Sequence, residues 1–143
     1  MNCMSRVCLS LVSLVVLAAN CATAAGGVWT GASDAQWTNS LNWTGAAYPL
    51  HGDTAMFSGP SGNTTVDVDG LQDIQYVTFD TPGVAAYTLG TGAANSQTLA
   101  MANNGTYQIG ANAATGQTFN CAIQLGTVTN GASFTFRNDS PIQ

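Results

Sequence analysis

The sequence predicts an all-β fold arranged as a parallel β-solenoid, and three observations support this prediction. Apolar and polar residues alternate with a period of two in several short runs, which is typical of strands with one face in a core. Turn-forming clusters separate these runs, and no apolar stripe at helical spacing follows residue 24. Small uncharged residues dominate, which suits strands that stack about 4.8 Å apart. A β-sandwich is the alternative, because it also uses many short strands.

Residues 1–24 have the order of a secretory signal peptide. Arg6 supplies a positive start, residues 7–19 are almost wholly apolar, and Ala22-Thr23-Ala24 matches a small-residue cleavage site. The apolar run is shorter than a membrane-spanning helix requires. We therefore expect cleavage after Ala24 and export to the extracellular space or the cell surface, with outer-membrane association left open. Lipid attachment at Cys21 is a minor alternative.

The expected exported chain is acidic. It holds seven Asp and no Glu or Lys, and its other ionisable side chains include one arginine (Arg137), one histidine (His51) and one cysteine (Cys121). Such a chain is repelled by phosphate backbones and anionic lipids, so nucleic-acid binding is excluded. A lone cysteine forms no intramolecular disulfide, and we expect Cys121 to be a buried small hydrophobe.

Residues 25–57 form an aromatic-rich segment directly after the signal. Trp29, Trp37, Trp43 and Tyr48 lie within twenty residues of one another. The favoured interpretation is that they cap the first coil and shield its apolar interior from water, because they directly follow the signal. The other is that their flat faces stack on sugar rings, as in carbohydrate-binding sandwich modules. Burial of the indoles would favour the cap, and exposure in one plane would favour sugar binding.

Residues 58–143 are expected to form the coils of the solenoid. The clearest alternation places Phe119, Cys121, Ile123 and Leu125 on one face of a single strand. Shorter alternations predict strands around Val66 and Val68, Tyr87 and Leu89, Leu99 and Met101, Tyr107 and Ile109, and Phe134 and Phe136. Residues that tolerate positive φ predict turns at Asp69-Gly70, Pro82-Gly83, Gly90-Thr91-Gly92, Asn103-Asn104-Gly105 and Asn130-Gly131.

Faint internal echoes predict the length of a coil. Gln97-Thr98-Leu99 returns in form as Gln117-Thr118-Phe119, twenty residues later, and residues 86–91 return as residues 122–127. A coil of roughly 20 to 25 residues would give about five coils in the exported chain.

The Trp-rich segment resembles the start of large bacterial surface proteins of the autotransporter-associated β-strand repeat type. The likeness is carried by Trp29-Thr30-Gly31, Trp37, Asn42-Trp43, Pro49, Gly52-Asp53-x-Ala-x-Phe57, Thr78-Phe79-Asp80 and Tyr87-Thr88-Leu89-Gly90. In that family the segment follows a signal peptide and leads into a right-handed parallel β-helix. The resemblance therefore implies a non-enzymatic passenger or surface scaffold, with further coils joined to it.

Two groups of residues could carry chemistry, and each has a simpler interpretation. His51-Gly52-Asp53 could supply a base, with residues 58–61 as the nearest serines, but a presented nucleophile turn is missing and a solvent-facing histidine is favoured. Asp67, Asp69 and Asp73 could bind calcium through their oxygens. Their spacing departs from the EF-hand loop, and the simpler interpretation is a solvated strand end.

We assign no catalytic, cofactor-binding or metal-binding residue. Polysaccharide hydrolases need paired carboxyl groups across the scissile bond. A lyase needs a basic residue to take up a proton, and Arg137, which stays protonated, is the only Lys or Arg in the mature chain. We predict a non-enzymatic exported surface scaffold or adhesin-like passenger segment. A carbohydrate-binding β-sandwich module is the alternative, and contact with carbohydrate or a cell surface is left open.

The last predicted strand, around Phe134 and Phe136, leaves a strand edge open. An uncovered edge offers unpaired N–H and C=O groups to any neighbour. We therefore expect the chain to be truncated, and to continue into or associate with further coils. We expect the isolated product to self-associate or to be marginally stable.

Overall fold

The structure, a computed structural model, describes residues 26–45, 47–126 and 131–142; the predicted signal peptide at 1–24 lies outside them. The described residues form strands and one short 3-10 helix, η1 (Ser40–Asn42), so the all-β prediction is confirmed for them. The strands are β1 (Gly26–Val28), β2 (Thr54–Met56), β3 (Thr65–Val66), β4 (Leu71–Phe79), β5 (Thr88–Leu89), β6 (Thr98–Ile109), β7 (Thr118–Phe119), β8 (Ala122–Leu125) and β9 (Thr135–Asn138).

All strand pairs in the two sheets are parallel. The larger sheet has the order β1-β2-β4-β6-β8, with β9 also pairing β6, and the smaller sheet has the order β3-β5-β7. Strands that pair come from successive passes of the chain around one axis, because a parallel pair needs a long connection between its strands. The fold is therefore a parallel β-solenoid, as predicted, and not a sandwich, and it has about 4 turns.

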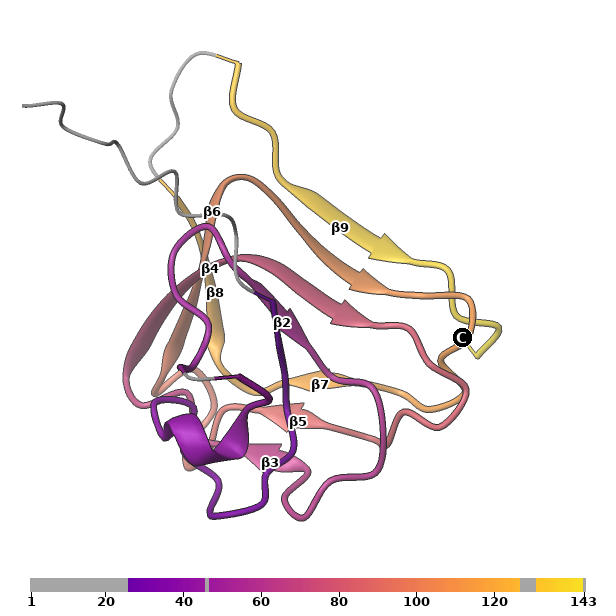
Figure 1. The fold of residues 1–143 in the computed structure, drawn as a ribbon. Helices are drawn as coiled ribbons and strands as arrows, with labels where there is room; N and C mark the ends of the chain where they lie inside the picture. The colour runs from indigo at the N-terminus through magenta and orange to yellow at the C-terminus, as the bar shows by residue number, and fades with distance from the viewer. Residues whose placement is uncertain (1–25, 46, 127–130, 143) are drawn as a thin grey trace, which may run out of the picture.

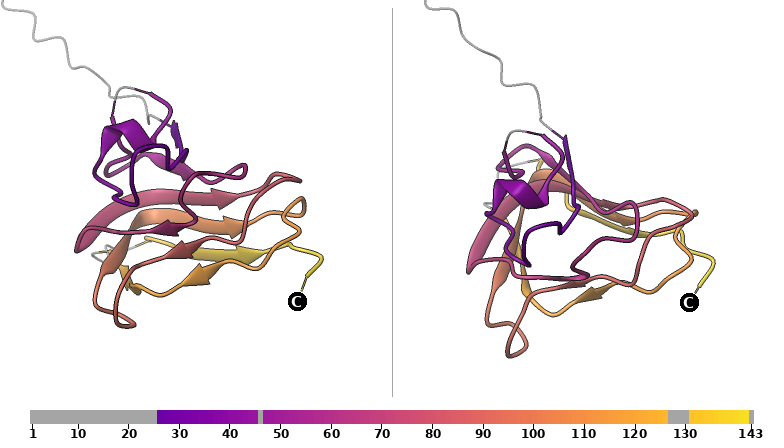
Figure 2. Two further views of the ribbon diagram at one scale, coloured as in Figure 1. Left: turned by 90° about the horizontal axis from the view of Figure 1, so that it is seen from below. Right: turned by 60° about the horizontal axis from the view of Figure 1, so that its bottom comes forward.

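Each coil has three faces, because the long strands bend. Residues 71–74 of β4 pair with 98–101 of β6, and residues 76–79 pair with 106–109, with a register shift between Ile74 and Tyr76. Figure 1 shows the resulting outline, with β3, β5 and β7 along the bottom and the two halves of β4 and β6 on the other sides. Figure 2 shows the coils stacked, with the indigo segment at one end and β9 at the other.

The bend in β6 coincides with a predicted turn. Asn103-Asn104-Gly105 lies within the strand, and Asn104 has a φ of 62°. A Cβ on Gly105 would lie 2.6 Å from the carbonyl oxygen of Gln75 in the preceding coil. The predicted turn is thus a corner inside a continuous strand, and glycine is required there because two coils come into close contact.

The predicted coil length is partly wrong. Met56 pairs with Thr78, 22 residues later, but Thr78 pairs with Gln108, 30 residues later. The echoes do not stack on each other, since Thr118 pairs with Thr88 and Thr98 pairs with Ala122. Coils of uneven length explain why about 4 turns form instead of the predicted five.

The predicted single strand from Phe119 to Leu125 is two strands on different faces. β7 ends at Phe119 and β8 begins at Ala122, so the chain turns a corner at Asn120 and Cys121. Cys121 is buried, as predicted, whereas Leu125 is exposed. The alternation continues through the corner, which made the two strands look like one.

Inward side chains form columns along the solenoid axis. One column joins Trp29, Phe57 and Phe79, which follow one another in register. The neighbouring column grows in size, from Gly27 and Ala55 to the larger Val77, Tyr107 and Phe136. The small residues at its start leave room for the indole of Trp43, since a Cβ on Gly27 would lie 3.1 Å from that ring.

Candidate functional site

The indoles of the Trp-rich segment are buried over the first coil. Trp29, Trp37 and Trp43 are 2%, 0% and 4% exposed. Trp43 makes edge-to-face contacts with both other indoles, at centroid distances of 5.0 Å and 4.8 Å, and also contacts Phe57. The indole faces are therefore covered by protein and do not form a stacking platform for sugars.

Each indole N–H is held by a backbone carbonyl. Trp43 donates to the carbonyl oxygen of Trp37 (2.7 Å), and Trp29 donates to that of Asn63 (2.8 Å). Trp37 donates to that of Pro49. A buried indole N–H without a partner would destabilise the fold, so these bonds make burial of the cluster favourable.

Asn42 is a fully buried polar residue that ties the loop above the first coil. Its Oδ1 accepts from the backbone amides of Ser33 and Asp34, and its Nδ2 donates to the Asp34 carboxylate and to the carbonyl of Gln36. The amide of Gln36, followed by Asn39 and Asn42, holds the pKa of Asp34 below its usual range. Sequence reasoning missed this role, although Asn42 precedes a tryptophan in the resemblance.

The same segment closes the strand edges of the first coil. The Val28 amide donates to Thr44 Oγ1, and the Val28 carbonyl accepts from the Thr44 amide. On the smaller sheet, the Asp67 amide donates to the Ala35 carbonyl, and the Trp37 amide donates to the Asp67 carbonyl. The outer edges of β1 and β3 are thus occupied.

The three candidate calcium ligands bond to different partners, and one of them, Asp73, pairs with the candidate base His51. His51 Nδ1 lies 2.8 Å from Asp73 Oδ2, and both side chains are exposed, as expected for the histidine. Asp69 accepts from the amide and hydroxyl of Thr38. Asp67 accepts from Gln97 and from the Asp69 amide, which is the main reason that its pKa lies below the usual range. Within the described residues, no three His, Cys, Asp or Glu side chains gather as a metal site would require.

Ser61, one of the serines near His51 in the sequence, forms a hydrogen bond with the backbone. Ser61 Oγ donates to the carbonyl of Asn63 at 2.6 Å, and the Tyr87 hydroxyl donates to the carbonyl of Gly59. The Ser61 bond therefore stabilises its own loop, and the Tyr87 bond joins that loop to the following coil.

Amide side chains connect successive coils at the corners. Gln97 Oε1 accepts from the amides of Val68 and Thr91, and Gln117 Oε1 accepts from the amide of Tyr87. Asn120 donates to the carbonyl of Gly90, thirty residues earlier. The echo between Gln97 and Gln117 was a signal of this shared role, although the predicted spacing was wrong.

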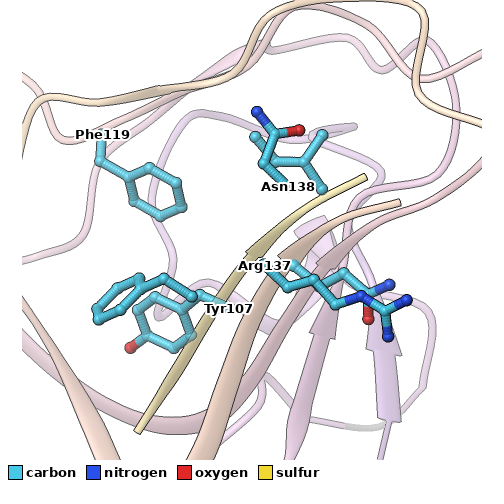
Figure 3. A pocket seen from close by; sticks show the side chains of 7 residues that line it. Tyr107, Phe119, Arg137 and Asn138 are labelled. Atoms are coloured by element: carbon cyan, nitrogen blue, oxygen red, sulfur yellow. The ribbon is translucent and has the colours of Figure 1, made fainter. Parts of the chain in front are cut away.

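The opposite end of the solenoid is hollow. Tyr107, Phe119 and Phe136 line a cavity of about 190 Å³, with Ile109, Gln108, Arg137 and Asn138 at its margin. Tyr107 and Phe119 stack with an interplanar angle of 4°, and Phe136 contacts Tyr107 edge-on. Figure 3 shows Asn138 on the same side of β9 as Phe119 and Tyr107, and Arg137 pointing away from them.

Burial raises the pKa values of two ionisable groups near this end. The Tyr107 hydroxyl is buried without a hydrogen-bond partner among the described residues, and burial raises the pKa of Tyr107 far above its usual range. Burial likewise raises the pKa of the Cys121 thiol. Arg137 Nε lies 2.5 Å from Asp139 Oδ2 on the exposed surface. At neutral pH the phenol of Tyr107 is therefore protonated and the thiol of Cys121 is neutral.

No family model, curated protein or solved structure matches this chain. Across the described ranges, no helix reaches the length and apolarity needed to cross a membrane.

Proposed function

We propose that this chain is a non-enzymatic scaffold segment of an exported surface protein, similar to an adhesin-like passenger. The observation that carries the proposal is the buried cap formed by the three indoles and Asn42 over one end of a stack of coils. A repeat array needs such a terminal unit, because its first coil would otherwise expose an apolar stack to water.

The use of polar side chains supports the same function. The backbone of the preceding coil forms hydrogen bonds with the side chains of Gln97, Gln117 and Asn120. Asp67 and Asp69 accept from neighbouring coils and loops in the same way. These groups hold the coils together, which is the property that an extended scaffold requires.

The resemblance to autotransporter-associated β-strand repeat proteins agrees with this proposal. Several residues that carry it, including Asn42, Trp43, Pro49 and Phe57, build the cap. A cap at the leading end of a solenoid would explain why these residues occur together. The buried indoles weigh against the alternative of a carbohydrate-binding module that uses them as its platform.

Secretion and surface exposure test the proposal. The full chain, produced in a bacterial host with an epitope tag at its C-terminus, should reach the cell exterior with a mature N-terminus at Ala25. Retention of an unprocessed chain in the cytoplasm would contradict it, and a mature N-terminus at Cys21 would indicate lipidation instead.

An activity assay tests the non-enzymatic part. The exported chain should not cleave plant or bacterial polysaccharides. Turnover that disappears in His51→Ala, but persists in the matched surface variant Thr65→Ala, would show that the His51 and Asp73 pair is catalytic.

A further inference from the structure

We propose that two copies of this chain pair end to end through β9, as an antiparallel two-fold dimer. The joined ends are the hollow ends, and the Trp-rich ends point away from each other. This goes beyond a scaffold role, because it names the partner and the residues that select it.

The backbone of β9 has one free side. β9 pairs with β6 on its inner side, and the Asp139 amide continues this ladder by donating to the Ile109 carbonyl. Successive residues of a strand direct their backbone groups to opposite sides, so those of Phe136 and Asn138 face away from β6. No strand pairs with that side in the described part of the chain.

The same end carries apolar surface that a second strand would cover. Phe136 is 59% exposed, and Leu125 of the last coil is 47% exposed. Phe136 borders the cavity that Tyr107 and Phe119 line. Pairing at this edge would remove Phe136 from water and would extend the parallel stack by one antiparallel layer.

Charge favours a second copy of this chain as the partner. Arg137 and Asp139 lie two residues apart, so both side chains leave the same, outward face of the strand. An antiparallel pair centred on Asn138 would place each Arg137 opposite Asp139 of the second copy. One register of this chain with itself thus forms two opposite-charge pairs, and cross-strand pairs of this kind stabilise a sheet.

The distribution of the aspartates and the closed edge of β1 also favour joining the two hollow ends. Six of the seven aspartates lie between residues 34 and 80, in the first coils. Joining the hollow ends keeps these acidic regions apart, whereas joining Trp-rich ends would bring them together. A head-to-tail arrangement would require an open edge at β1, and Thr44 already occupies that edge.

Charge-reversal variants of the exported chain test the proposal by sedimentation velocity over a range of concentrations. The unchanged chain should form a dimer. Arg137→Glu alone and Asp139→Arg alone should each weaken dimerisation by at least about tenfold, because each places like charges opposite each other. An equimolar mixture of the two variants should restore a dimer, because opposite charges would again face each other across the two copies. The ion pair within one copy cannot account for such a rescue.

Matched controls keep the result interpretable. Circular dichroism should show the same strand content for both variants. Asp73→Arg, which reverses an exposed charge on the half of β4 that stacks below β8 and not below β9, should still dimerise. A concentration-independent monomer of the unchanged chain would overturn the proposal. Equal association of all variants, or open-ended polymers, would overturn it as well, while secretion and surface exposure would be unaffected.

Discussion

The two ends of this solenoid solve the same physical problem differently. At the first end, a loop covers the strand edges and buries three indoles. At the other end, β9 keeps one edge unpaired among the described residues, and Phe136 and the rim of a cavity are exposed. Repetition of coils satisfies the interior strands but not the terminal ones, so each end needs its own solution.

The two ends differ in the size of the side chains in the terminal coil and in what covers them. Gly27 and Ala55 are small where Trp43 enters, and Pro49 packs against Gly27. The last coil has Tyr107 and Phe136 in the same column, and these rings leave a cavity beneath them. A closed end thus combines small residues in the coil with large residues in the cap.

The largest expected effect comes from removing the central indole. Trp43→Ala should lower the free energy of unfolding by about 3–5 kcal/mol, because it empties a buried site among three aromatic rings. Phe136→Ala at the exposed end should lower it by less than about 1 kcal/mol. Urea unfolding of both variants measures this contrast, at concentrations low enough to keep the chain monomeric. Equal losses would show that the ends are not different in stability.

The buried amide should matter nearly as much. Asn42→Ala leaves the amides of Ser33 and Asp34 without their acceptor and should cost about 1–3 kcal/mol. Asn138→Ala, whose side chain accepts from the Ser140 amide at the exposed end, should stay within about 0.5 kcal/mol of the unchanged chain. Equilibrium unfolding in urea compares the two. A neutral Asn42→Ala would show that the loop does not depend on this residue.

The thiol of Cys121 reports on how firmly the last full coil is closed. Cys121 is 3% exposed, and burial raises its pKa, so labelling by a thiol reagent at neutral pH should be at least about tenfold slower in the folded chain than in urea. Mass spectrometry follows the reaction. Labelling at the unfolded rate would show that the coil opens freely at the hollow end.

The smallest expected effect is a dependence on acid. The Asp69 amide lowers the pKa of Asp67, so the folded chain releases that proton more readily than the unfolded chain. This stabilisation is complete above about pH 4, the ordinary range of an aspartate, and is lost as pH falls through the lower folded pKa.

Asp67→Asn tests this dependence, because its amide oxygen can still accept from the Asp69 amide and from Gln97. The variant should lose less stability than the unchanged chain between about pH 5 and about pH 2. Urea midpoints across that range measure the difference. An unchanged slope would show that Asp67 does not contribute to the acid response.

Local patterns allowed the fold class to be predicted. The period-two alternation of β5 and the positive φ of Gly90 and Gly92 depend on neighbouring residues alone. The exposed Phe136 at a strand edge followed from the same alternation. The burial of Cys121 was predictable from the sequence in the same way.

The tertiary structure alone decided the register and the partners. Gln97 meets Asp67 thirty residues away, and Tyr107 stacks on Phe119 from another face. Alternation through residues 119–125 hid a corner, because the side-chain period is the same on both sides of it. Coil length depends on how many residues each corner uses, and stacking of the coils selects that number. The burial of the three indoles was favoured by their place directly after the signal, but only the tertiary structure decided it, since an amphipathic ring suits either a cap or a binding surface until its neighbours are in place.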